Sequence, residues 1–375
     1  MKKIAFLFLL ISTIACQNPS SKIIMPYTAA DFESTINDKK TLLYTLTNSN
    51  GMTVTLTNYG AKIVSIYAPD KNGEFADVVL GFKTIKEYET LDASQGAVIG
   101  PFANRIANAR FELNGEVYEL EANNHKANLH SGSNSFFRQV YDANVISPSS
   151  VEFSLEAKDG DSGFPGNKTL KVTYSLTTDN ELKIDYEATT DKPCPFNLTN
   201  HAYFNLKGEG NGNILDHIVF IDADSTTEII NNEMIPTGNI ISIKGTDLDF
   251  TTPRAIGERI DSEFAPIKIA RGYDHNYILN KDQNIPVMTL CATVYEPVSG
   301  RFMEVSTTEP AVQLFTSNGM RGLTGKSGNE YKRYYGFCLE TQHYPDSPNH
   351  SHFPNTILNP GETLKSTTIY KFSVK

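Results

Sequence analysis

A single carboxylate occupies an unusual place in the chain. Glu340 directly follows the mainly apolar run Tyr335–Leu339, which reads YGFCL, and precedes Thr341. Burying a carboxylate costs free energy unless the group gains a partner or serves a purpose. We therefore expect Glu340 to point into a partly enclosed site instead of filling an ordinary core position.

Two histidines lie in segments with strand-like flanks. His130 is the third residue of NLHSG, and His201 is the fifth residue of NLTNHAYFNL. Histidine titrates near neutral pH and often acts as a general acid or base. A lone histidine is nevertheless more often a structural residue with satisfied hydrogen bonds, so neither position establishes chemistry on its own.

Four further polar residues stand in similar segments. Asn104 and Arg105 lie in GPFANRIA, Asp274 lies in GYDHNY, and Gln313 lies in VQLF. Each has an ordinary explanation, because Asn104-Arg105 fits a surface turn with an ion pair and Asp274 fits a turn cap. Taken one at a time, these segments do not identify a site.

Two other patterns resemble sites and are better explained as loops. The stretch 322–327 reads GLTGKS, but a phosphate-binding loop needs glycine where Met320 stands and a parallel βαβ unit around it. We expect a glycine-rich surface loop there. His343, His350 and His352 match no standard zinc spacing, and the prolines among them suit a rigid loop, so no metal site is predicted.

Composition limits the classes of partner. The 375 residues include 33 Lys and Arg against 43 Asp and Glu, a formal net charge of −10. This balance disfavours nucleic acid and anionic substrates but not neutral ones. The cysteines have no CxxC spacing, so buried free thiols are expected, with one disulfide as the alternative. They are Cys16, Cys194, Cys291 and Cys338.

Alternation of apolar and polar residues with a period of two predicts strands along most of the chain. The clearest candidates are Met52–Asn58, Lys62–Tyr67, Val151–Ala157, Lys168–Leu176 and Leu182–Thr189. Asn114-Gly115 predicts a hairpin between Ala109–Leu113 and Val117–Leu120, and Thr84–Leu91 is the best helix candidate. The pattern predicts an all-β fold, a large antiparallel β-sandwich with few short helices, as a single domain over residues 41–375.

The first 16 residues, MKKIAFLFLLISTIAC, predict export. Lys2 and Lys3 precede an apolar run that is too short to span a bilayer. Ala15-Cys16 resembles the end of a bacterial lipoprotein signal, which would leave Cys16 lipidated, although Thr13 stands where an aliphatic residue is usual; ordinary cleavage near Ala15 is the alternative. Residues 17–40 would form a tether and lead-in. We expect a periplasmic, outer-membrane or cell-surface protein whose membrane contact is the lipid anchor.

In their order along the chain, these segments resemble the aldose 1-epimerase family from about Tyr44 to the C-terminus. NYGA at 58–61, GDSGFPG at 160–166, PDSPN at 345–349 and NPGE at 359–362 add to the match. The resemblance implies the large β-sandwich of the galactose mutarotase type. It also implies an enzyme that interconverts the α and β anomers of free aldoses such as galactose or glucose. Pro101-Phe102, Ser131 and the stretch 133–141 depart from the family pattern, which puts substrate preference in question more than reaction type.

The resemblance also implies roles for single residues. Glu340 matches the catalytic base, His201 the acid, and His130 a second histidine beside the ring oxygen. The residues that match sugar-binding positions are Asn104, Arg105, Asp274 and Gln313. A carboxylate and a histidine on opposite sides of the C1–O5 unit can open the ring without a cofactor or metal. For this, Glu340 should be ionised and one histidine protonated, and a nearby Asp274 would favour the imidazolium.

Two other functions stay open at this point. A glycan-cleaving enzyme on the same fold would use Glu340 and Asp274 as its two carboxylates, which leaves the histidines without a clear task. A non-catalytic sugar-binding lipoprotein would not need the acid and base pair. The expected partner in each case is a small carbohydrate, and no nucleic acid is expected.

Overall fold

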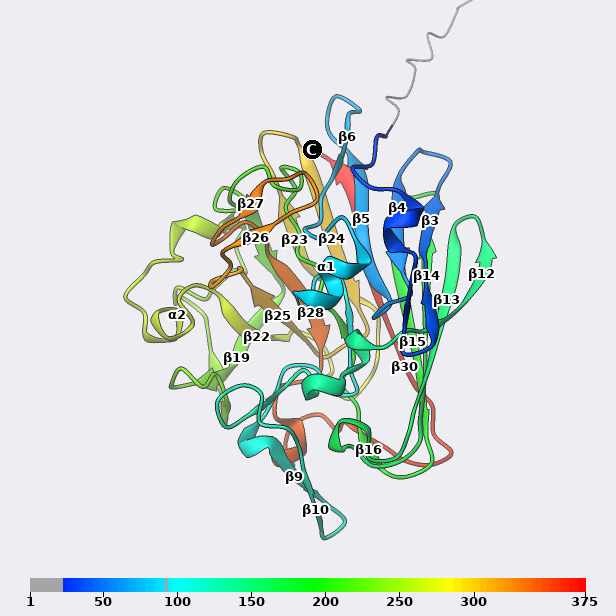
Figure 1. Ribbon diagram of the computed structural model, residues 1–375. Coiled ribbons are helices and arrows are strands. Elements are labelled where there is room, and N and C mark those ends of the chain that lie inside the picture. Colours follow the sequence, from blue (N-terminus) through cyan, green and yellow to red (C-terminus); the bar gives the residue numbers. More distant parts are fainter. Residues whose placement is uncertain (1–22, 92–93) are drawn as a thin grey trace, which may run out of the picture.

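The computed structural model describes residues 23–91 and 94–375. The predicted signal segment, Cys16 and the start of the predicted tether lie outside the described residues. Regular structure in the described part is mostly β (Figure 1), and its two α-helices are short: α1 (Ile85–Thr90) and α2 (Ala265–Ala270). The all-β prediction is confirmed.

The largest element is a nine-stranded antiparallel sheet in which the chain's last strand, β30, occupies the centre. Its strands in spatial order are β12 (Asp142–Ser147), β13 (Ser150–Ala157), β14 (Lys168–Leu176), β15 (Glu181–Thr190), β30 (Leu364–Val374), β24 (Arg301–Thr307), β23 (Thr289–Tyr295), β18 (Ile218–Ile221) and β21 (Arg254–Ala255). Polar residues of β13 to β15 alternate with buried apolar ones, as expected for strands with one face on the core.

Two smaller antiparallel sheets complete the layers. The five-stranded sheet runs β20 (Pro236–Ser242), β19 (Ala223–Ile229), β22 (Asp274–Leu279), β25 (Ala311–Phe315) and β28 (Cys338–Gln342). The four-stranded sheet runs β3 (Leu43–Thr47), β4 (Thr53–Thr57), β5 (Lys62–Pro69) and β6 (Phe75–Asp77). Every residue of β28 and β4 is buried, so both faces of these strands are covered.

Short two-stranded ladders fix the connections between the sheets. They are β1 (Ser34–Ile36) with β2 (Lys39–Thr41), β7 (Val98–Ile99) with β17 (Thr199–Asn200), β8 (Arg105–Ile106) with β11 (Asn128–Leu129), β9 (Arg110–Leu113) with β10 (Glu116–Glu119), β16 (Cys194–Pro195) with β29 (Ile357–Leu358), and β26 (Leu323–Thr324) with β27 (Glu330–Tyr331). The pairs β7–β17 and β8–β11 matter most, because each ends beside a histidine of the site.

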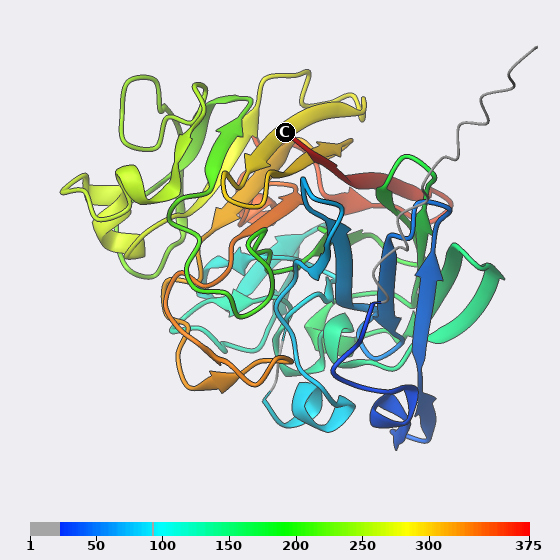
Figure 2. The ribbon, with the colours of Figure 1, turned by 90° about the horizontal axis from the view of Figure 1, so that it is seen from above.

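The nine-stranded sheet backs both smaller sheets. Tyr44 of β3 packs edge-to-face on Phe153 of β13, with ring centroids 5.3 Å apart. The hydroxyl of Thr341 in β28 lies 2.5 Å from that of Thr368 in β30. Figure 2 shows the strands of the four-stranded sheet, in blue, beside β30, in red. This layered packing is the predicted sandwich.

The structure confirms three predictions that rest on neighbouring residues: a strand, a hairpin and a short helix. The structure begins and ends β14 at Lys168 and Leu176, as predicted. The predicted hairpin forms as β9 and β10 around Asn114 and Gly115, which both have positive φ as a type I′ turn requires. Helix α1 begins after Thr84, whose hydroxyl accepts from the Glu87 N–H in a capping box.

The prediction of a surface loop at 322–327 is wrong for its lysine. Lys326 is fully buried, and its Nζ lies 2.7 Å from Asp77 Oδ2 at the end of β6. The same ammonium donates to the carbonyls of Val64 and Val79. A Cβ at Gly325 would overlap the ring of Tyr331, so glycine lets the loop turn inward and deliver the lysine to the four-stranded sheet.

The three described cysteines, Cys194, Cys291 and Cys338, are buried free thiols, as predicted. In residues 23–91 and 94–375, no helix has the length and apolar character needed to cross a membrane.

Candidate active site

Glu340 lies in the middle of β28 and is only 3% exposed. Its neighbour across the sheet is Gln313 of β25. Glu340 Oε1 lies 3.7 Å from His201 Nε2, and its Oε2 has no hydrogen-bond partner among the described residues. Burial, aided by the negative charge of Asp274 and opposed by Arg105, raises the pKa of Glu340 from 4.5 to about 8. The prediction of a carboxylate in an enclosed site is therefore met.

His201 follows β17 and is 5% exposed. Its backbone N–H donates to the Ala97 carbonyl at 2.8 Å, which ties the residue to the region of β7. The imidazole stacks on Tyr203, with ring centroids 4.9 Å apart and an interplanar angle of 10°. Burial lowers the pKa of His201 to about 4, with Asp274 opposing the shift. The imidazole is thus held in place by packing and keeps its Nε2 turned to Glu340.

His130 follows β11 and is locked to Asn104. The His130 N–H donates to the Asn104 carbonyl at 2.9 Å, and the Asn104 N–H donates to His130 Nδ1 at 3.1 Å. Both residues have positive φ, 52° and 63°, an uncommon conformation that a functional site can justify. The enclosed position of His130 and the nearby His201 and Arg105 lower its pKa well below the usual value.

This hydrogen bond also fixes the tautomer of His130. Because Nδ1 accepts, the neutral ring carries its proton on Nε2 and presents a donor to the pocket. The ring lies edge-to-face with His201 at a centroid distance of 5.3 Å. The neighbouring Ser131 also has positive φ, and its hydroxyl accepts from the Phe102 N–H at 2.8 Å, which supports the loop from below.

A second cluster of polar side chains, formed by Arg105, Asp274 and Gln313, occupies the other side of the pocket. Arg105 Nη2 lies 3.7 Å from Asp274 Oδ2, and Gln313 Nε2 donates to Asp274 Oδ1 at 2.6 Å. Arg105 Nη1 also donates to Asn104 Oδ1 at 3.3 Å. These bonds leave Arg105 and Asp274 partly exposed to the pocket, at 13% and 18% of their side chains.

A glycine sets the position of Asp274. Gly272 has a φ of 135°, and a Cβ there would overlap the side chain of Asn318. The Asn318 amide donates at 2.9 Å to the carbonyls of Ala270 and Tyr273. The end of α2 is thereby clamped to the start of β22, where Asp274 is the first residue.

These side chains enclose one pocket of about 220 Å³. Its lining residues are Ser94, Asn104, Arg105, Leu129, His130, His201, Tyr203, Asp274, Phe315 and Glu340. The structure thus brings together Glu340, both histidines and three of the four predicted sugar-binding residues. The fourth, Gln313, contacts Asp274 and acts through it.

The sequence interpretation missed four lining residues. Tyr203 and Phe315 carried a usable signal, because each lies two residues from a predicted site residue, His201 or Gln313, on the same strand-like face. Ser94 and Leu129 carried no such signal. Glu340 and His201 also stand next to each other, whereas the mechanism drawn from the resemblance had them on opposite sides of the sugar's C1–O5 unit.

The pocket contains three side chains that could serve as metal ligands. His130, His201 and Glu340 offer ligand atoms within 4.8 Å of one another. Two imidazoles and a carboxylate are common zinc ligands. However, His130 carries its proton on the nitrogen that faces the pocket, so it serves as a hydrogen-bond donor and not as a ligand.

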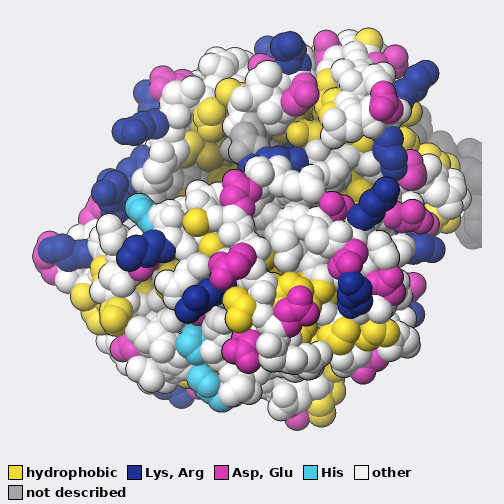
Figure 3. Space-filling view, turned by 60° about the horizontal axis from the view of Figure 1, so that its bottom comes forward, with side chains coloured by type: hydrophobic (Ala, Val, Ile, Leu, Met, Phe, Trp, Pro, Cys, Tyr) yellow, Lys and Arg dark blue, Asp and Glu magenta, His cyan; other side chains and the backbone are white. Residues whose placement is uncertain are grey.

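The second group of histidines forms a loop, as predicted. His343 Nδ1 lies 2.7 Å from Glu309 Oε2, His350 Nε2 lies 3.2 Å from Asp346 Oδ2, and His352 Nε2 lies 2.8 Å from the Gly238 carbonyl. The rings of His343 and His352 therefore have hydrogen-bond partners, and the ring of His350 faces the Asp346 carboxylate. Figure 3 shows histidine side chains reaching the surface among small, mixed groups of acidic and basic residues.

Comparison with known proteins agrees with this architecture. The sequence model of the family Aldose 1-epimerase matches residues 42–371. The chain is 40% identical to galactose mutarotase of Sus scrofa over 327 residues, 87% of this chain and 92% of that protein. It is 38% identical to aldose 1-epimerase of Haemophilus influenzae over 333 residues, 88% of this chain and 95% of that protein.

Solved structures agree as well. A GalM/aldose epimerase homologue from C. elegans superposes with a TM-score of 0.81 at 32% identity, covering 88% of this chain and 98% of that one. Galactose 1-epimerase from Lactobacillus acidophilus gives 0.80 at 26% identity, covering 91% and 97%. The fold, the pocket and these matches define an isomerase that acts on carbohydrates. Within that class, the chain belongs to the aldose 1-epimerase family, whose activity is the interconversion of the α and β anomers of aldoses.

Proposed function

We propose that Glu340 and His201 together open and close the ring of a free aldose. The observation that carries the proposal is their 3.7 Å separation inside a polar pocket. Within residues 23–91 and 94–375, one atom of each side chain has no hydrogen-bond partner: Glu340 Oε2 and His201 Nδ1. O1 and O5 of a cyclic sugar are both bonded to C1. Two groups this close can therefore reach both oxygens from one side.

The proton accounting of the step is simple. The Glu340 carboxylate removes the proton from the C1 hydroxyl, the C1–O5 bond breaks as the C1=O1 bond forms, and His201 donates its proton to O5. Rotation about the C1–C2 bond followed by the reverse transfers yields the other anomer. Each proton transfer contributes about 10²–10⁴-fold, so no further catalytic group is needed.

Glu340 and His201 together carry one titrating proton, both when the two side chains are neutral and when they are a carboxylate and an imidazolium. Burial favours an uncharged Glu340 beside a neutral His201, whereas ring opening starts from a carboxylate and an imidazolium. The expectation of an ionised Glu340 and a protonated histidine thus describes the arrangement that burial alone disfavours. The neutral pair and the carboxylate–imidazolium pair differ only in whether Glu340 or His201 carries the proton. The proton passes between the two side chains through the sugar oxygens O1 and O5. Sugar hydroxyls that form hydrogen bonds with the carboxylate or the imidazolium stabilise these charged forms.

The remaining polar residues are assigned to holding the sugar. His130 donates from Nε2 beside the ring oxygen. Asn104, Arg105 and Asp274 bind the hydroxyls on the other side of the ring, and Gln313 orients Asp274. Tyr203 and Phe315 supply apolar surface against the C–H faces. The mixed donors and acceptors suit a neutral polyol, because each unpaired buried hydroxyl would cost affinity.

The substrate is proposed to be a free aldohexose, with galactose and glucose first. The relatives from Sus scrofa and other mammals bear the name galactose mutarotase, and this supports galactose by similarity. We also propose export and anchoring through lipidated Cys16, on the strength of the N-terminal sequence alone. Labelling of the cells with a fatty acid should mark the wild type and not a Cys16→Ser variant. Equal labelling would refute the anchor.

Polarimetry tests the activity directly. Freshly dissolved α-galactose or α-glucose should reach its equilibrium rotation faster with the enzyme than without it. Absence of acceleration, together with release of reducing ends from a glycan, would instead favour the glycan-cleaving alternative. Sugar binding without acceleration would favour a non-catalytic binding protein.

A further inference from the structure

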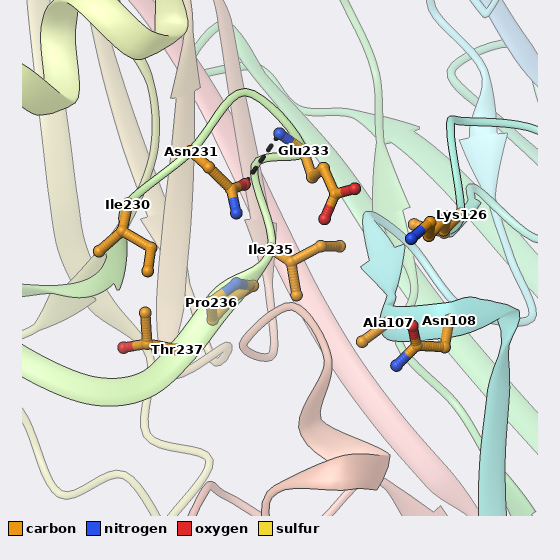
Figure 4. A pocket seen from close by; sticks show the side chains of 10 residues that line it. Ala107, Asn108, Lys126, Ile230, Asn231, Glu233, Ile235, Pro236 and Thr237 are labelled. Carbon is orange, nitrogen blue, oxygen red and sulfur yellow. Dashed lines mark hydrogen bonds between the residues drawn. The ribbon is translucent and has the colours of Figure 1, made fainter.

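A hollow between the end of α2 and the open end of the β26–β27 hairpin has an unusual charge. It encloses about 400 Å³, and among the residues that the structure describes no acidic side chain lines it. Figure 4 shows a contrasting hollow beside the β19–β20 loop, where the carboxylate of Glu233 and the ammonium of Lys126 lie on opposite walls. The first of these, which we call the cationic hollow, is lined by four basic residues, Arg271, Arg321, Lys332 and Arg333, together with Asn318 and Met320.

The positive charges of the cationic hollow are largely unneutralised. Within the described part of the chain, the side chains of Arg271, Arg321 and Lys332 make no hydrogen bond and no ion pair. Arg333 has one acidic neighbour, Asp261, whose Oδ1 lies 3.9 Å from Arg333 Nη2 and whose side chain is 78% exposed. Such an exposed contact contributes little, so the four like charges repel one another. In a chain with a formal net charge of −10, this local excess of positive charge favours the binding of an anion.

One wall of the cationic hollow is held in a fixed geometry. The Arg333 guanidinium lies over the Tyr334 ring, 4.3 Å from its centroid, and its Nη2 donates to the Arg271 carbonyl at 2.8 Å. The Tyr334 hydroxyl donates to the same carbonyl at 3.0 Å. Arg271, Ser317 and Tyr334 have positive φ values of 57°, 53° and 65°, although none of them is glycine. Backbone strain of this kind clusters at ligand sites, and here it surrounds a guanidinium that is already oriented.

The other basic side chains come from segments that the fold brings together. Arg271 directly follows α2, Arg321 precedes β26, and Lys332 follows β27. Because Leu323 pairs with Tyr331, Arg321 and Lys332 both lie at the open end of the hairpin. A guanidinium can bind two oxygens of one phosphate group, and an ammonium adds a compact positive charge. The volume of the hollow has room for a phosphate group and for the small organic part that carries it.

The cationic hollow shares two wall segments with the catalytic pocket. Arg271 lies three residues before Asp274, which lines the catalytic pocket. Asn318 lies three residues after Phe315, which lines the catalytic pocket as well. The Asn318 amide joins the two segments, because it donates at 2.9 Å to two carbonyls of the segment 270–273. A ligand that fixes Arg271 and Asn318 therefore also fixes Asp274.

We propose that the cationic hollow binds a small molecule that carries a phosphate group, and that its occupation tightens sugar binding in the catalytic pocket. The bound phosphate relieves the repulsion among the basic side chains and holds the segments of Arg271 and Asn318 in the arrangement that positions Asp274. The effect falls on affinity and not on proton transfer, because Asp274 lies across the pocket from the His201–Glu340 pair. The phosphate site itself does not depend on the function proposed above, whereas its effect on sugar binding rests on the role proposed there for Asp274.

Calorimetric titration at constant ionic strength tests both parts of the proposal. Glycerol 3-phosphate should bind the wild type with a Kd of about 1 mM or tighter, and inorganic phosphate should bind more weakly. Arg321→Gln combined with Lys332→Gln should raise the Kd of glycerol 3-phosphate about tenfold or more. Lys40→Gln combined with Lys86→Gln removes the same charge at exposed positions of β2 and α1 and should leave this Kd within about twofold. Saturating glycerol 3-phosphate should lower the Kd of galactose about threefold in the wild type and in this control, but not in the first double variant.

Each other outcome overturns a stated part of the proposal. Equal phosphate Kd values in the two double variants would show an adventitious ion only and would refute the site. Binding to vesicles that contain phosphatidylglycerol, without binding of either soluble phosphate, would also refute it and would identify a lipid surface instead. An unchanged Kd of galactose in the presence of bound glycerol 3-phosphate would refute the link to Asp274. Polarimetry without phosphate is recorded separately: no acceleration would refute the function proposed above, and the phosphate Kd values would still decide on the site.

Discussion

Two acidic side chains, the partly buried Asp77 and the buried Glu340, each face a basic side chain, and they are satisfied to very different extents. Asp77 lies 2.7 Å from Lys326 Nζ and also accepts from the Ser65 hydroxyl and from the N–H groups of Ile66 and Val79. Glu340 faces His201 at 3.7 Å, and one oxygen of its carboxylate has no partner among the described residues.

The difference separates a structural pair from the pair that we propose to be catalytic. The Asp77–Lys326 pair gains enough hydrogen bonds to offset its desolvation, and it joins the 322–327 loop to the four-stranded sheet. The Glu340–His201 pair keeps bonding capacity that only a ligand can use. A buried polar atom without a partner costs free energy, and the folded protein bears that cost where a substrate hydroxyl will later bind.

The largest expected effect comes from removing the charge of the unsatisfied group. Glu340→Gln should lower kcat by about 10³-fold or more, because the group proposed to deprotonate the C1 hydroxyl is lost. The free energy of unfolding should not fall, since a neutral amide is cheaper to bury than a carboxylate. Polarimetry and urea denaturation measure the two quantities, and calorimetry with sugar should still detect binding.

At the Asp77–Lys326 pair, we expect the opposite result: a loss of stability with little loss of activity. Lys326→Met should lower the free energy of unfolding by about 3 kcal/mol, because the mostly buried Asp77 would be left without a counter-charge. The folded fraction should keep kcat/KM within about threefold. Asp77→Asn combined with Lys326→Met should recover part of the loss in denaturation experiments. If Lys326→Met is as stable as the wild type, the Asp77–Lys326 pair does not stabilise the fold, and its proposed difference from the Glu340–His201 pair is refuted.

The pH dependence of the wild type tests whether the catalytic pair shares one proton. The kcat/KM should be flat between about pH 4, the pKa of His201, and about pH 8, the pKa of Glu340. Above the upper limit the pair loses its single proton, and below the lower limit it holds two. A profile that peaks sharply near the ordinary histidine pKa would contradict the shared proton.

The same shift affects stability with a definite sign. The pKa of Glu340 is raised from 4.5, so its favourable contribution is complete below that value and is lost as the pH rises toward about 8. Urea denaturation over this range should show a decline in wild-type stability that is absent in Glu340→Gln.

The smallest effect is expected from the second carboxylate of the pocket. Asp274 raises the pKa of both Glu340 and His201. Asp274→Asn should therefore move both limits of the pH profile downward, each by up to about one unit. The KM should also rise, because the variant weakens the contact with Arg105. Movement of the two limits in opposite directions would show that Asp274 does not act through its charge.

The sequence predicted those parts of the molecule that depend on nearby residues. Lys168–Leu176 alternates because one face of its strand is exposed, and Asn114-Gly115 has only one hairpin geometry that suits it. The stretch 53–57 also alternates, yet all five residues are buried. Its polar face is covered by Tyr27, whose hydroxyl lies 2.7 Å from that of Thr55, and sequence spacing does not reveal such a distant partner.

The same distinction between nearby and distant residues applies to the site. The type of residue and the order of the segments identified Glu340, His201, His130 and the sugar-binding group as candidates. The proposed sharing of one proton by Glu340 and His201 depends on burial and on a 3.7 Å contact between β28 and the end of β17, which only the folded chain creates. The positions of Ser94 and Leu129 in the pocket likewise depend on the fold.

The central place of β30 has a consequence for the order in which the protein can be completed. Its 11 residues separate β15 from β24, and the Tyr370 hydroxyl donates to the Leu339 carbonyl of the catalytic strand. During synthesis, both neighbouring strands remain open edges until this late segment emerges, and open edges invite wrong pairing. The strand that carries Glu340 therefore gains its backing only after residues 364–374 have been synthesised. Nascent chains shorter than about residue 364 should have no activity, and their survival depends on keeping two unfinished sheet edges apart.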